Sequence, residues 1–253
     1  YTTLFRSKAG LVSQSVILER SITPKHPISP IPRAVYSGSL LAALFLGLGV
    51  ILLRYLFYTK ILSLNDVVKY TNASVLGVIP KYQNEIPQNQ ILVHNKPKSL
   101  IAESLRAIRT NLQFIDNSEG PKLIAITSTI SSEGKTFFAM NLAGILAFSN
   151  KRVIVIDLDM RMPKIHLGFN VVNDKGISTI LSNIDDIDSC IRSSKIKNLD
   201  FITAGPPPPN PSELILTPQM ALLIDNLKSK YDYVIVDNPP VGIVTDGMQS
   251  IIM

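Results

Sequence analysis

Residues 129–136 read Thr-Ile-Ser-Ser-Glu-Gly-Lys-Thr, between an apolar run and a long apolar segment of helical character. A Gly-Lys-Thr turn in that context predicts a phosphate site, because backbone N–H groups of the loop and the positive end of the following helix both attract anions. In such a loop Lys135 reaches the β- and γ-phosphates of a nucleotide, and the Thr136 hydroxyl binds Mg²⁺. Nucleotide contacts are expected from Ser131, Ser132, Glu133, Gly134, Lys135, Thr136 and Phe137.

Two acidic segments follow the loop in the order that a nucleotide site requires. Residues 153–156 read Val-Ile-Val-Ile and precede Asp157 and Asp159, whereas residues 233–236 read Tyr-Val-Ile-Val and precede Asp237. Each is an apolar strand that ends in a carboxylate, and carboxylates at strand ends can reach Mg²⁺. Asp157 and Asp159 repel each other unless a cation or a proton lies between them. Together the three segments predict ATP bound with Mg²⁺, with one carboxylate free to accept a proton from a hydroxyl group.

Each motif taken singly has a structural alternative. Thr129 stands where the full phosphate-loop pattern has its first glycine, so the loop by itself could be a serine-rich strand–helix turn. The acidic pair could be a solvated strand tip, with Arg161 neutralising one carboxylate. Asp237 could be a structural acid at a strand end, and Asp246 is a weaker candidate for the same neighbourhood. The order of the three motifs favours the nucleotide site.

The apolar runs predict the fold class. Four short runs, at 123–127, 153–156, 199–203 and 233–236, read as buried strands separated by helical patterns. This alternation predicts an α/β fold, a mostly parallel P-loop NTPase-like sheet with helices on both faces. We expect the sheet to be incomplete at its C-terminal end, because the sequence stops soon after the last run.

Helices are predicted before and after the loop. From Ser99, apolar residues at 101, 105, 108 and 112 follow a helical period, with Glu103, Arg106, Arg109 and Gln113 on the opposite side. Asn210-Pro211 and Thr217-Pro218 each place a capping residue before proline and predict two helix starts. Residues 65–80 read as a short helix followed by a strand at 75–79, and the polar stretch 81–98 reads as a linker.

Residues 35–58 form an apolar stretch whose only charge is Arg54. About 20 apolar residues span a bilayer core of about 30 Å, so the stretch predicts a transmembrane helix. A signal peptide fits poorly, because 34 residues precede the stretch and no cleavage pattern follows it. Positive charges are balanced across the span, and ATP decides the orientation: residues after Tyr58 should be cytoplasmic and residues before Val35 outside.

The expected organisation has four parts. These are an extracytoplasmic tail (1–34), the transmembrane helix (35–58), a juxtamembrane segment and linker (59–98) and a cytoplasmic ATP-binding domain (99–253). The sequence begins at Tyr1 without methionine, so we expect a fragment of a longer protein. The net charge of +6 is scattered without an aromatic basic stripe, and we expect no nucleic-acid partner. Cys190 is the only cysteine and the three histidines are isolated, so none of them is assigned a role.

Taken together, these motifs resemble the bacterial tyrosine kinases of capsule and exopolysaccharide export, fused to a chain-length-determinant (polysaccharide co-polymerase) membrane module. The resemblance runs from about Ser29 to the end of the sequence. The matching features are Asp157-x-Asp159-x-Arg161, the segment from Asp237 to Pro240, the Glu103-x-x-Arg106-x-x-Arg109 helix, the proline-rich segment 205–213 and prolines 30 and 32 before the span.

The resemblance implies an activity and an assembly. It implies autophosphorylation of tyrosines in a tail of a neighbouring subunit, with Mg²⁺-ATP, in the inner (plasma) membrane. It also implies a homo-oligomeric ring built by Glu103, Arg106 and Arg109, which regulates polysaccharide polymerisation and export together with that machinery. By the same resemblance, the catalytic residues are Lys135, Asp157, Asp159 and Asp237, with Asp157 as the base. The expected Mg²⁺ ligands are Thr136, Asp159 and Asp237, and Arg161 contacts the nucleotide.

Two departures keep other interpretations open. Ser131-Ser132 stand where the family has Pro-Gly, so the loop loses glycine freedom, and no tyrosine-rich tail lies within the sequence. A polysaccharide co-polymerase scaffold with a degenerate nucleotide site is therefore the alternative. A partitioning-type ATPase fits less well, because such proteins carry a further lysine where this chain has Ile130. Glu103 and Arg106 could also be a solvated intrahelical pair.

Overall fold

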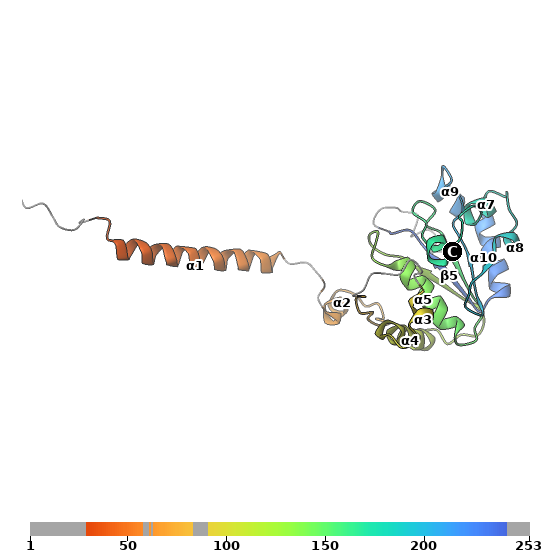
Figure 1. The fold of residues 1–253 in the computed structure, drawn as a ribbon, viewed down its shortest axis with the longest axis horizontal. Helices are drawn as coiled ribbons and strands as arrows, with labels where there is room; N and C mark the ends of the chain where they lie inside the picture. Colours follow the sequence, from red (N-terminus) through yellow and green to blue (C-terminus); the bar gives the residue numbers. More distant parts are fainter. Residues whose placement is uncertain (1–28, 58–60, 62, 83–90, 242–253) are drawn as a thin grey trace, which may run out of the picture. The chain divides into compact units, whose positions relative to one another are not determined.

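The computed structural model describes residues 29–57, 61, 63–82 and 91–241. It divides into two compact units, Tyr1–Asp66 and Val67–Met253, which are considered separately. Figure 1 shows the elements of both. The first unit contains helix α1 (Pro32–Leu56), and α2 (Leu64–Tyr70) lies where the first unit ends and the second begins.

Helix α1 is a continuous apolar helix of 25 residues. It starts three residues before the predicted span because Pro32 occupies its first position, where the missing N–H costs no helical bond. The Ser37 and Ser39 hydroxyls donate to carbonyls of the preceding turn, so neither leaves an unpaired polar group on the helix. By length and composition, α1 is the one helix in the described part of the chain that could cross a membrane. Tyr58, the predicted end of the span, lies outside the described residues.

The second unit is built on a five-stranded sheet of order β1-β5-β2-β4-β3. The first four strands in that order are parallel, which confirms the predicted α/β class, and each predicted strand lies within one residue of an observed one. The short β3, which pairs antiparallel with β4, was not predicted from the sequence. The strands are β1 (Lys122–Ile126), β2 (Val153–Asp157), β3 (Arg192–Ser193), β4 (Leu199–Ile202) and β5 (Tyr233–Asp237).

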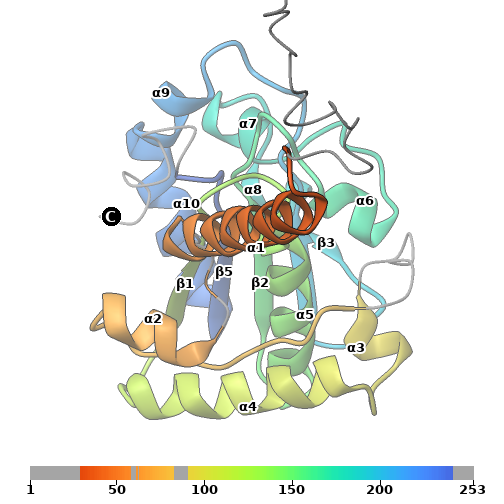
Figure 2. The same cartoon turned by 90° about the vertical axis from the view of Figure 1, so that its left-hand side faces the viewer.

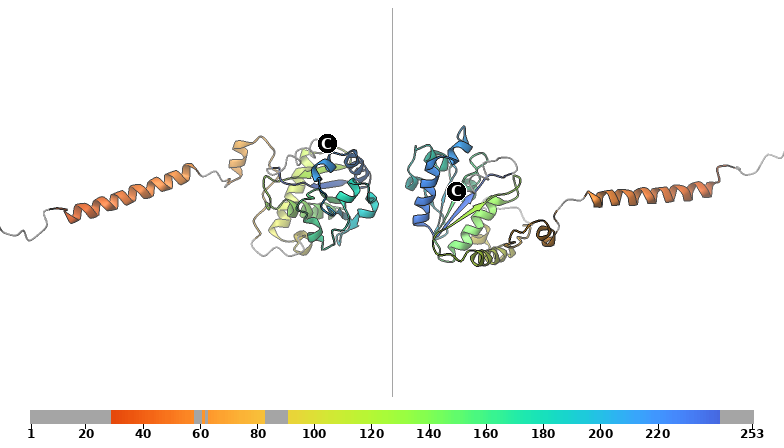
Figure 3. Two further views of the ribbon diagram at one scale, coloured as in Figure 1. Left: turned by 90° about the horizontal axis from the view of Figure 1, so that it is seen from above. Right: turned by 180° about the vertical axis from the view of Figure 1, so that it is seen from behind.

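Helices cover both faces of this sheet (Figures 2 and 3). Val153 and Val155 of β2 pack into one core cluster, and Ile154 and Ile156 pack into the other, as alternation along a strand requires. On the first face lie α3 (Leu92–Asn95), α4 (Leu100–Ile115), α5 (Lys135–Ala147) and α6 (Ile165–Phe169). On the second lie α7 (Ile177–Leu181), α8 (Ile187–Cys190), α9 (Pro211–Ile215) and α10 (Pro218–Lys230).

The predicted helix starts are confirmed, although their caps differ. The Ser99 hydroxyl accepts from the Ala102 N–H and caps α4. Helices α9 and α10 begin at Pro211 and Pro218 as expected. The Asn210 side chain instead donates to Glu213, and the Thr217 hydroxyl donates to the Leu214 carbonyl. Proline at the first position, rather than a side-chain cap, therefore marks these two starts.

Two predictions for the segment before α4 are wrong. Residues 75–79 form no strand, and the Leu76 carbonyl accepts from a side chain instead: Asn111 Nδ2 donates to it at 2.8 Å. The expected linker 81–98 contains α3, whose Leu92 and Val93 are buried in the core. A short apolar triplet (91–93) inside a polar stretch is enough to place this segment in the domain, whereas residues 83–90 lie outside the described part of the chain.

Candidate functional site

The site lies where parallel strands end. In the β2–β5 register Asp157 pairs with Asp237, so two carboxylates emerge side by side at the carboxyl edge of the sheet. Helix α5 starts at Lys135, after the loop that follows β1, and β1 pairs with the other side of β5. Parallel strands thus bring the three sequence motifs to one edge, where α/β folds bind ligands.

Lys135 and Thr136 contact two of the three acids directly. The Lys135 ammonium lies 2.9 Å from an Asp159 carboxylate oxygen and 3.5 Å from one of Asp237. The Thr136 hydroxyl donates to the other Asp237 oxygen at 2.6 Å. All three charged side chains are at most 8% exposed. The residues predicted to surround a metal-bound triphosphate therefore converge in space.

Burial and mutual repulsion perturb the ionisation of this cluster. Burial raises the pKa of Asp237, against the opposing effects of Lys135 and the Thr136 hydrogen bond. Burial also works to lower the pKa of Lys135, but the charges of Asp237, Asp159 and Asp157 outweigh it, and the net pKa is raised. Lys135 is therefore held as a cation, and the carboxylates around it attract positive charge.

Asp157 has a different environment from the other two acids. One of its oxygens accepts from the Asp159 N–H at 3.1 Å, and the other accepts from the N–H groups of Lys164 and Ile165 at 3.2 and 3.1 Å. Its side chain is completely buried, and burial together with the charge of Asp237 raises its pKa to about 8. These contacts organise the loop between β2 and α6. Asp157, for which the family resemblance implied the role of catalytic base, therefore has a structural role in this fold.

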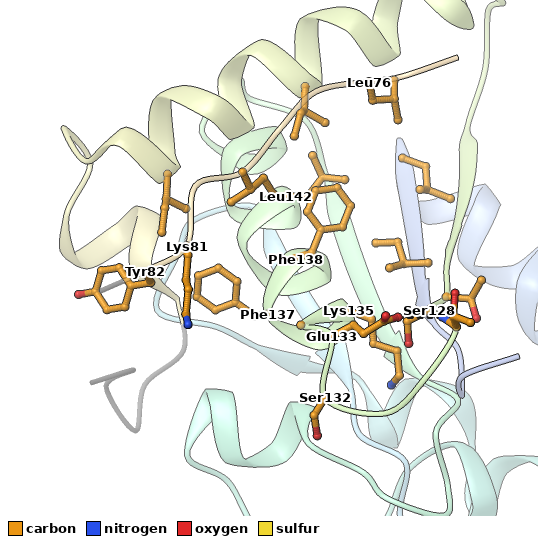
Figure 4. Close-up of a pocket in the computed structure, with 18 of the residues that line it drawn as sticks. Leu76, Lys81, Tyr82, Ser128, Ser132, Glu133, Lys135, Phe137, Phe138 and Leu142 are labelled. Atoms are coloured by element: carbon orange, nitrogen blue, oxygen red, sulfur yellow. Dashed lines mark hydrogen bonds between the residues drawn. The ribbon is translucent and has the colours of Figure 1, made fainter. Parts of the chain in front are cut away.

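Residues 129–134, here called the phosphate loop, lead into α5. At the start of that helix lies a cavity of about 180 Å³, here called the phosphate cavity. Gly134 precedes the helix with φ +96°, and Ser132 also has a positive φ of +71°. Figure 4, a close-up of a different, neighbouring cavity, draws the loop and some of its side chains. The first N–H groups of α5 have no partner within the helix and are available to an anion. The cavity is lined by Ser131, Ser132, Gly134, Lys135, Thr136, Phe137, Asp159, Met162 and Lys164.

Two expected nucleotide contacts do not line this cavity. Arg161 is exposed and donates to the Ser212 hydroxyl at 3.3 Å, at the start of α9. The Glu133 carboxylate accepts hydrogen bonds from backbone N–H groups of its own loop. Met162 and Lys164, by contrast, were not singled out from the sequence, because nothing in a single sequence shows that the β2–α6 loop folds back over the phosphate loop.

The residues of the expected oligomerisation helix make contacts within the chain. Glu103 and Arg106 form an intrahelical ion pair at 2.5 Å, and Arg106 also donates to the Pro97 carbonyl at 2.8 Å. Arg109 donates to the Ser149 hydroxyl beyond the end of α5. The intrahelical alternative is therefore present in the folded chain, where Glu103 remains exposed.

The donor set fits Mg²⁺ bound together with a nucleotide. Mg²⁺ is commonly held by one or two carboxylates, with phosphate oxygens and water completing six ligands. Asp159, Asp237 and the Thr136 hydroxyl supply oxygen ligands next to the phosphate cavity. Within the described ranges no group of three or more His, Cys, Asp and Glu side chains forms a metal site by itself. A metal here would thus depend on a bound nucleotide to complete its ligands.

Comparisons with known proteins agree with this geometry. A family model described as an AAA domain matches residues 121–248. The chain is 38% identical over 160 residues to the tyrosine-protein kinase YwqD of Bacillus subtilis, covering 63% of this chain and 68% of that protein. This chain belongs to the bacterial tyrosine kinase family. It is also 32% identical over 257 residues to the tyrosine-protein kinase ptk of Acinetobacter johnsonii, covering 98% of this chain and 35% of that one.

Solved structures support the same assignment. The chimerical protein CapA2B2 is 39% identical with a TM-score of 0.68, covering 74% of this chain and 80% of that one. The kinase domain of the Escherichia coli tyrosine kinase ETK is 32% identical with a TM-score of 0.67, covering 73% and 76%. Several curated members of the family are much longer, and the chain spans only about a third of their length.

Proposed function

We propose that this bacterial tyrosine kinase uses Mg²⁺-ATP to phosphorylate protein tyrosines. The observation that carries the proposal is the contact of Lys135 with both Asp159 and Asp237 beside the phosphate cavity. A cation, a hydroxyl and two carboxylates around a loop with free N–H groups provide what phosphoryl transfer needs. The names of the relatives support tyrosine as the acceptor.

The residues divide the chemistry between them. Lys135 and the first N–H groups of α5 hold the β- and γ-phosphates, while Thr136 and Asp237 orient the metal. When bound, Mg²⁺ neutralises charge that develops on the phosphate oxygens. A tyrosine oxygen forms a bond to the γ-phosphorus, the bond from that phosphorus to ADP breaks, and the tyrosine proton passes to a carboxylate. Asp159 lines the cavity and accepts one backbone N–H, from Met162, whereas Asp157 accepts three. Asp159 is therefore favoured over Asp157 as that base, and the metal is left chiefly to Thr136 and Asp237.

We further propose a membrane-anchored, oligomeric regulator of polysaccharide export. The length and apolar character of α1 support an inner-membrane helix, with the nucleotide unit on the cytoplasmic side. The exposed Glu103 on α4 supports a ring in which the Glu103, Arg106 and Arg109 pairings are exchanged between subunits. The resemblance to kinases of capsule and exopolysaccharide export supports the biological role.

Two paired measurements on the detergent-solubilised chain test the activity. Calorimetry should detect Mg²⁺-ADP binding, and labelled ATP should phosphorylate a glutamate–tyrosine copolymer. Lys135→Met should lower the labelling at least about a hundredfold, since it removes a charge-stabilising group from the site. The matched control Lys151→Met removes an exposed lysine at the opposite end of β2 and should leave both readouts unchanged. Equal labelling by Lys135→Met and the wild-type chain would refute the kinase.

The second candidate is a scaffold whose nucleotide site has degenerated. Ser132 with φ +71° supports it, because a side chain there is strained where glycine would not be. The same calorimetric experiment separates the two functions. The kinase requires Mg²⁺-ADP to bind at micromolar to millimolar concentrations, whereas the scaffold gives no binding heat at all.

A further inference from the structure

Glu133 contacts its own loop rather than the phosphate cavity. A single carboxylate oxygen, Oε2, accepts from the Thr129 N–H at 2.9 Å and from the Ile130 N–H at 3.3 Å. Figure 4 shows the Glu133 side chain reaching across the loop toward Ser128. The side chain thus joins the end of the loop to its beginning and closes it into a ring of five residues.

The beginning of the loop is itself fixed to the rest of the domain. The Ser128 hydroxyl donates to the Ile130 carbonyl at 2.8 Å, and the Val241 N–H donates to the Ser128 carbonyl at 2.9 Å. The Thr127 hydroxyl donates to the Pro239 carbonyl at 2.9 Å, after β5. Through Glu133, the far end of the loop is therefore held to the same framework that positions Asp237.

The loop needs such a brace because its sequence does not favour its shape. Thr129 stands at a position where phosphate loops have glycine, and Ser132 adopts a left-handed φ of +71°. Ser131 and Ser132 line the phosphate cavity, so any relaxation of this backbone moves the N–H groups that face an anion. A carboxylate that accepts two N–H groups is a strong local restraint.

We infer that Glu133 is a positioning residue: it braces the strained phosphate loop in its binding shape and does not contact the nucleotide. The inference rests on the proposed function, since it concerns the affinity of the same site. It also predicts the direction in which loss of the Glu133 side chain changes the affinity for the nucleotide. An acid that merely lay near the phosphates would repel them, and removing its charge would tighten binding.

Calorimetry of Mg²⁺-ADP binding to the detergent-solubilised chain tests this with two substitutions. Glu133→Ala removes both hydrogen bonds and should raise the Kd roughly tenfold, a typical effect of losing charged hydrogen bonds. Glu133→Gln keeps an acceptor oxygen at the same place without the charge, and should stay within about threefold of the wild-type Kd. The melting temperature should change little in either variant, because Glu133 is exposed and its hydrogen bonds restrain a single loop.

Glu119→Ala is the matched control, because it removes an exposed acid that precedes β1, whereas the loop follows that strand, and because Glu119 lies outside the phosphate cavity. It should leave the Kd unchanged. If Glu133→Ala binds as tightly as the wild-type chain, or if both Glu133 variants bind more tightly, the brace is refuted while the kinase stands. If the wild-type chain binds no Mg²⁺-ADP, the proposed function itself has failed.

Repeating the Glu133→Ala measurement in a Ser132→Gly chain tests whether Glu133 acts by holding the strained loop. Ser132→Gly should relieve the left-handed conformation, so the loop depends less on its brace. The Kd increase caused by Glu133→Ala should therefore be clearly smaller in the Ser132→Gly chain than in the wild-type chain. Equal increases in both backgrounds would show that Glu133 acts independently of the strain, and would overturn this explanation.

Discussion

Three carboxylates and one ammonium share the carboxyl edge of the sheet. Asp157, Asp159 and Asp237 surround Lys135, and each of these side chains is almost completely buried. An excess of buried negative charge stabilises bound protons and bound cations alike. The same imbalance that suits the cluster to a metal-bound nucleotide therefore predicts that the folded chain retains a proton there at neutral pH.

The first prediction concerns stability against pH. The pKa of Asp157 is raised from 3.8 to about 8 in the folded chain. Between pH 3.8 and 8, the folded chain therefore keeps a proton on Asp157 that the unfolded chain has already lost. The contribution of Asp157 to stability should then fall as pH rises from about 5 to 8, by at most about 1.4 kcal/mol per pH unit. Melting curves without nucleotide should show a falling melting temperature over this range. Asp157→Ala should show a flatter slope, and parallel slopes would contradict the assignment.

The side chains of the site could be predicted to different extents. Lys135, Thr136, Asp159 and Asp237 were found because each ends a recognisable local pattern, and parallel strands bring such ends together. The contact of Arg161 with Ser212 could not be predicted, because the two residues are 51 positions apart and no pattern links them. The roles of Asp157 and Glu133 depend on backbone N–H directions, which residue types do not encode.

At the level of elements, α5 is held at both of its ends. Its first turn carries Lys135 and Thr136, and its later part packs against α3 and α4. Asn141, completely buried in this helix, accepts from the Val93 N–H of α3 at 3.1 Å and donates to the Phe137 carbonyl at 2.8 Å. This amide joins the helix that carries Lys135 and Thr136 to α3, the segment that was expected to be part of a linker.

The second prediction follows from that buried amide. Asn141→Ala should lower the free energy of unfolding by about 2–3 kcal/mol, because it leaves a buried N–H of Val93 without an acceptor. Denaturant unfolding of the solubilised chain measures the change. The control is Asn111→Ala, since the exposed Asn111 makes one hydrogen bond, to the Leu76 carbonyl, and should cost less than about 1 kcal/mol. Equal losses of unfolding free energy in the two variants would show that the buried hydrogen bond is no more stabilising than the exposed one.

Elements with a strong hydrophobic period were predictable, and short ones were not. The four parallel strands and α4 each show a clear apolar pattern that burial explains. Helix α3 could not be predicted because it is a single turn of four residues, of which only Leu92 and Val93 are apolar, and polar residues surround it. Residues 75–79 had the composition of a strand, but in the folded chain Asn111 supplies the hydrogen bond to Leu76 that a strand would have supplied.

At the scale of the whole molecule, α1 is the expected membrane anchor. None of its 25 residues is buried in the folded chain, and its large apolar side chains are exposed. Exposure on that scale is unfavourable in water and is expected of a helix that lies in lipid.

The third prediction tests this anchor. The chain should remain with membranes after alkaline carbonate extraction. Replacing Leu44 and Leu48 near the centre of α1 by aspartate should release it, since each charge costs about 3 kcal/mol at the middle of a bilayer. Exchanging the same two leucines for valine preserves the apolar character and serves as the control. Retention of the aspartate variant in the membrane fraction would contradict a transmembrane α1.

Lys135, Thr136, Asp159 and Asp237 should surround a metal-bound nucleotide, and a crystal structure of the chain with Mn²⁺-ADP would show whether they do. The anomalous signal of manganese should lie about 2.1 Å from the Thr136 hydroxyl oxygen, beside Asp159 and Asp237. The phosphates should lie against the start of α5, with the Lys135 ammonium moved from the carboxylates to a phosphate oxygen. A nucleotide bound elsewhere, with Lys135 still between Asp159 and Asp237, would show that these four residues do not form the nucleotide site.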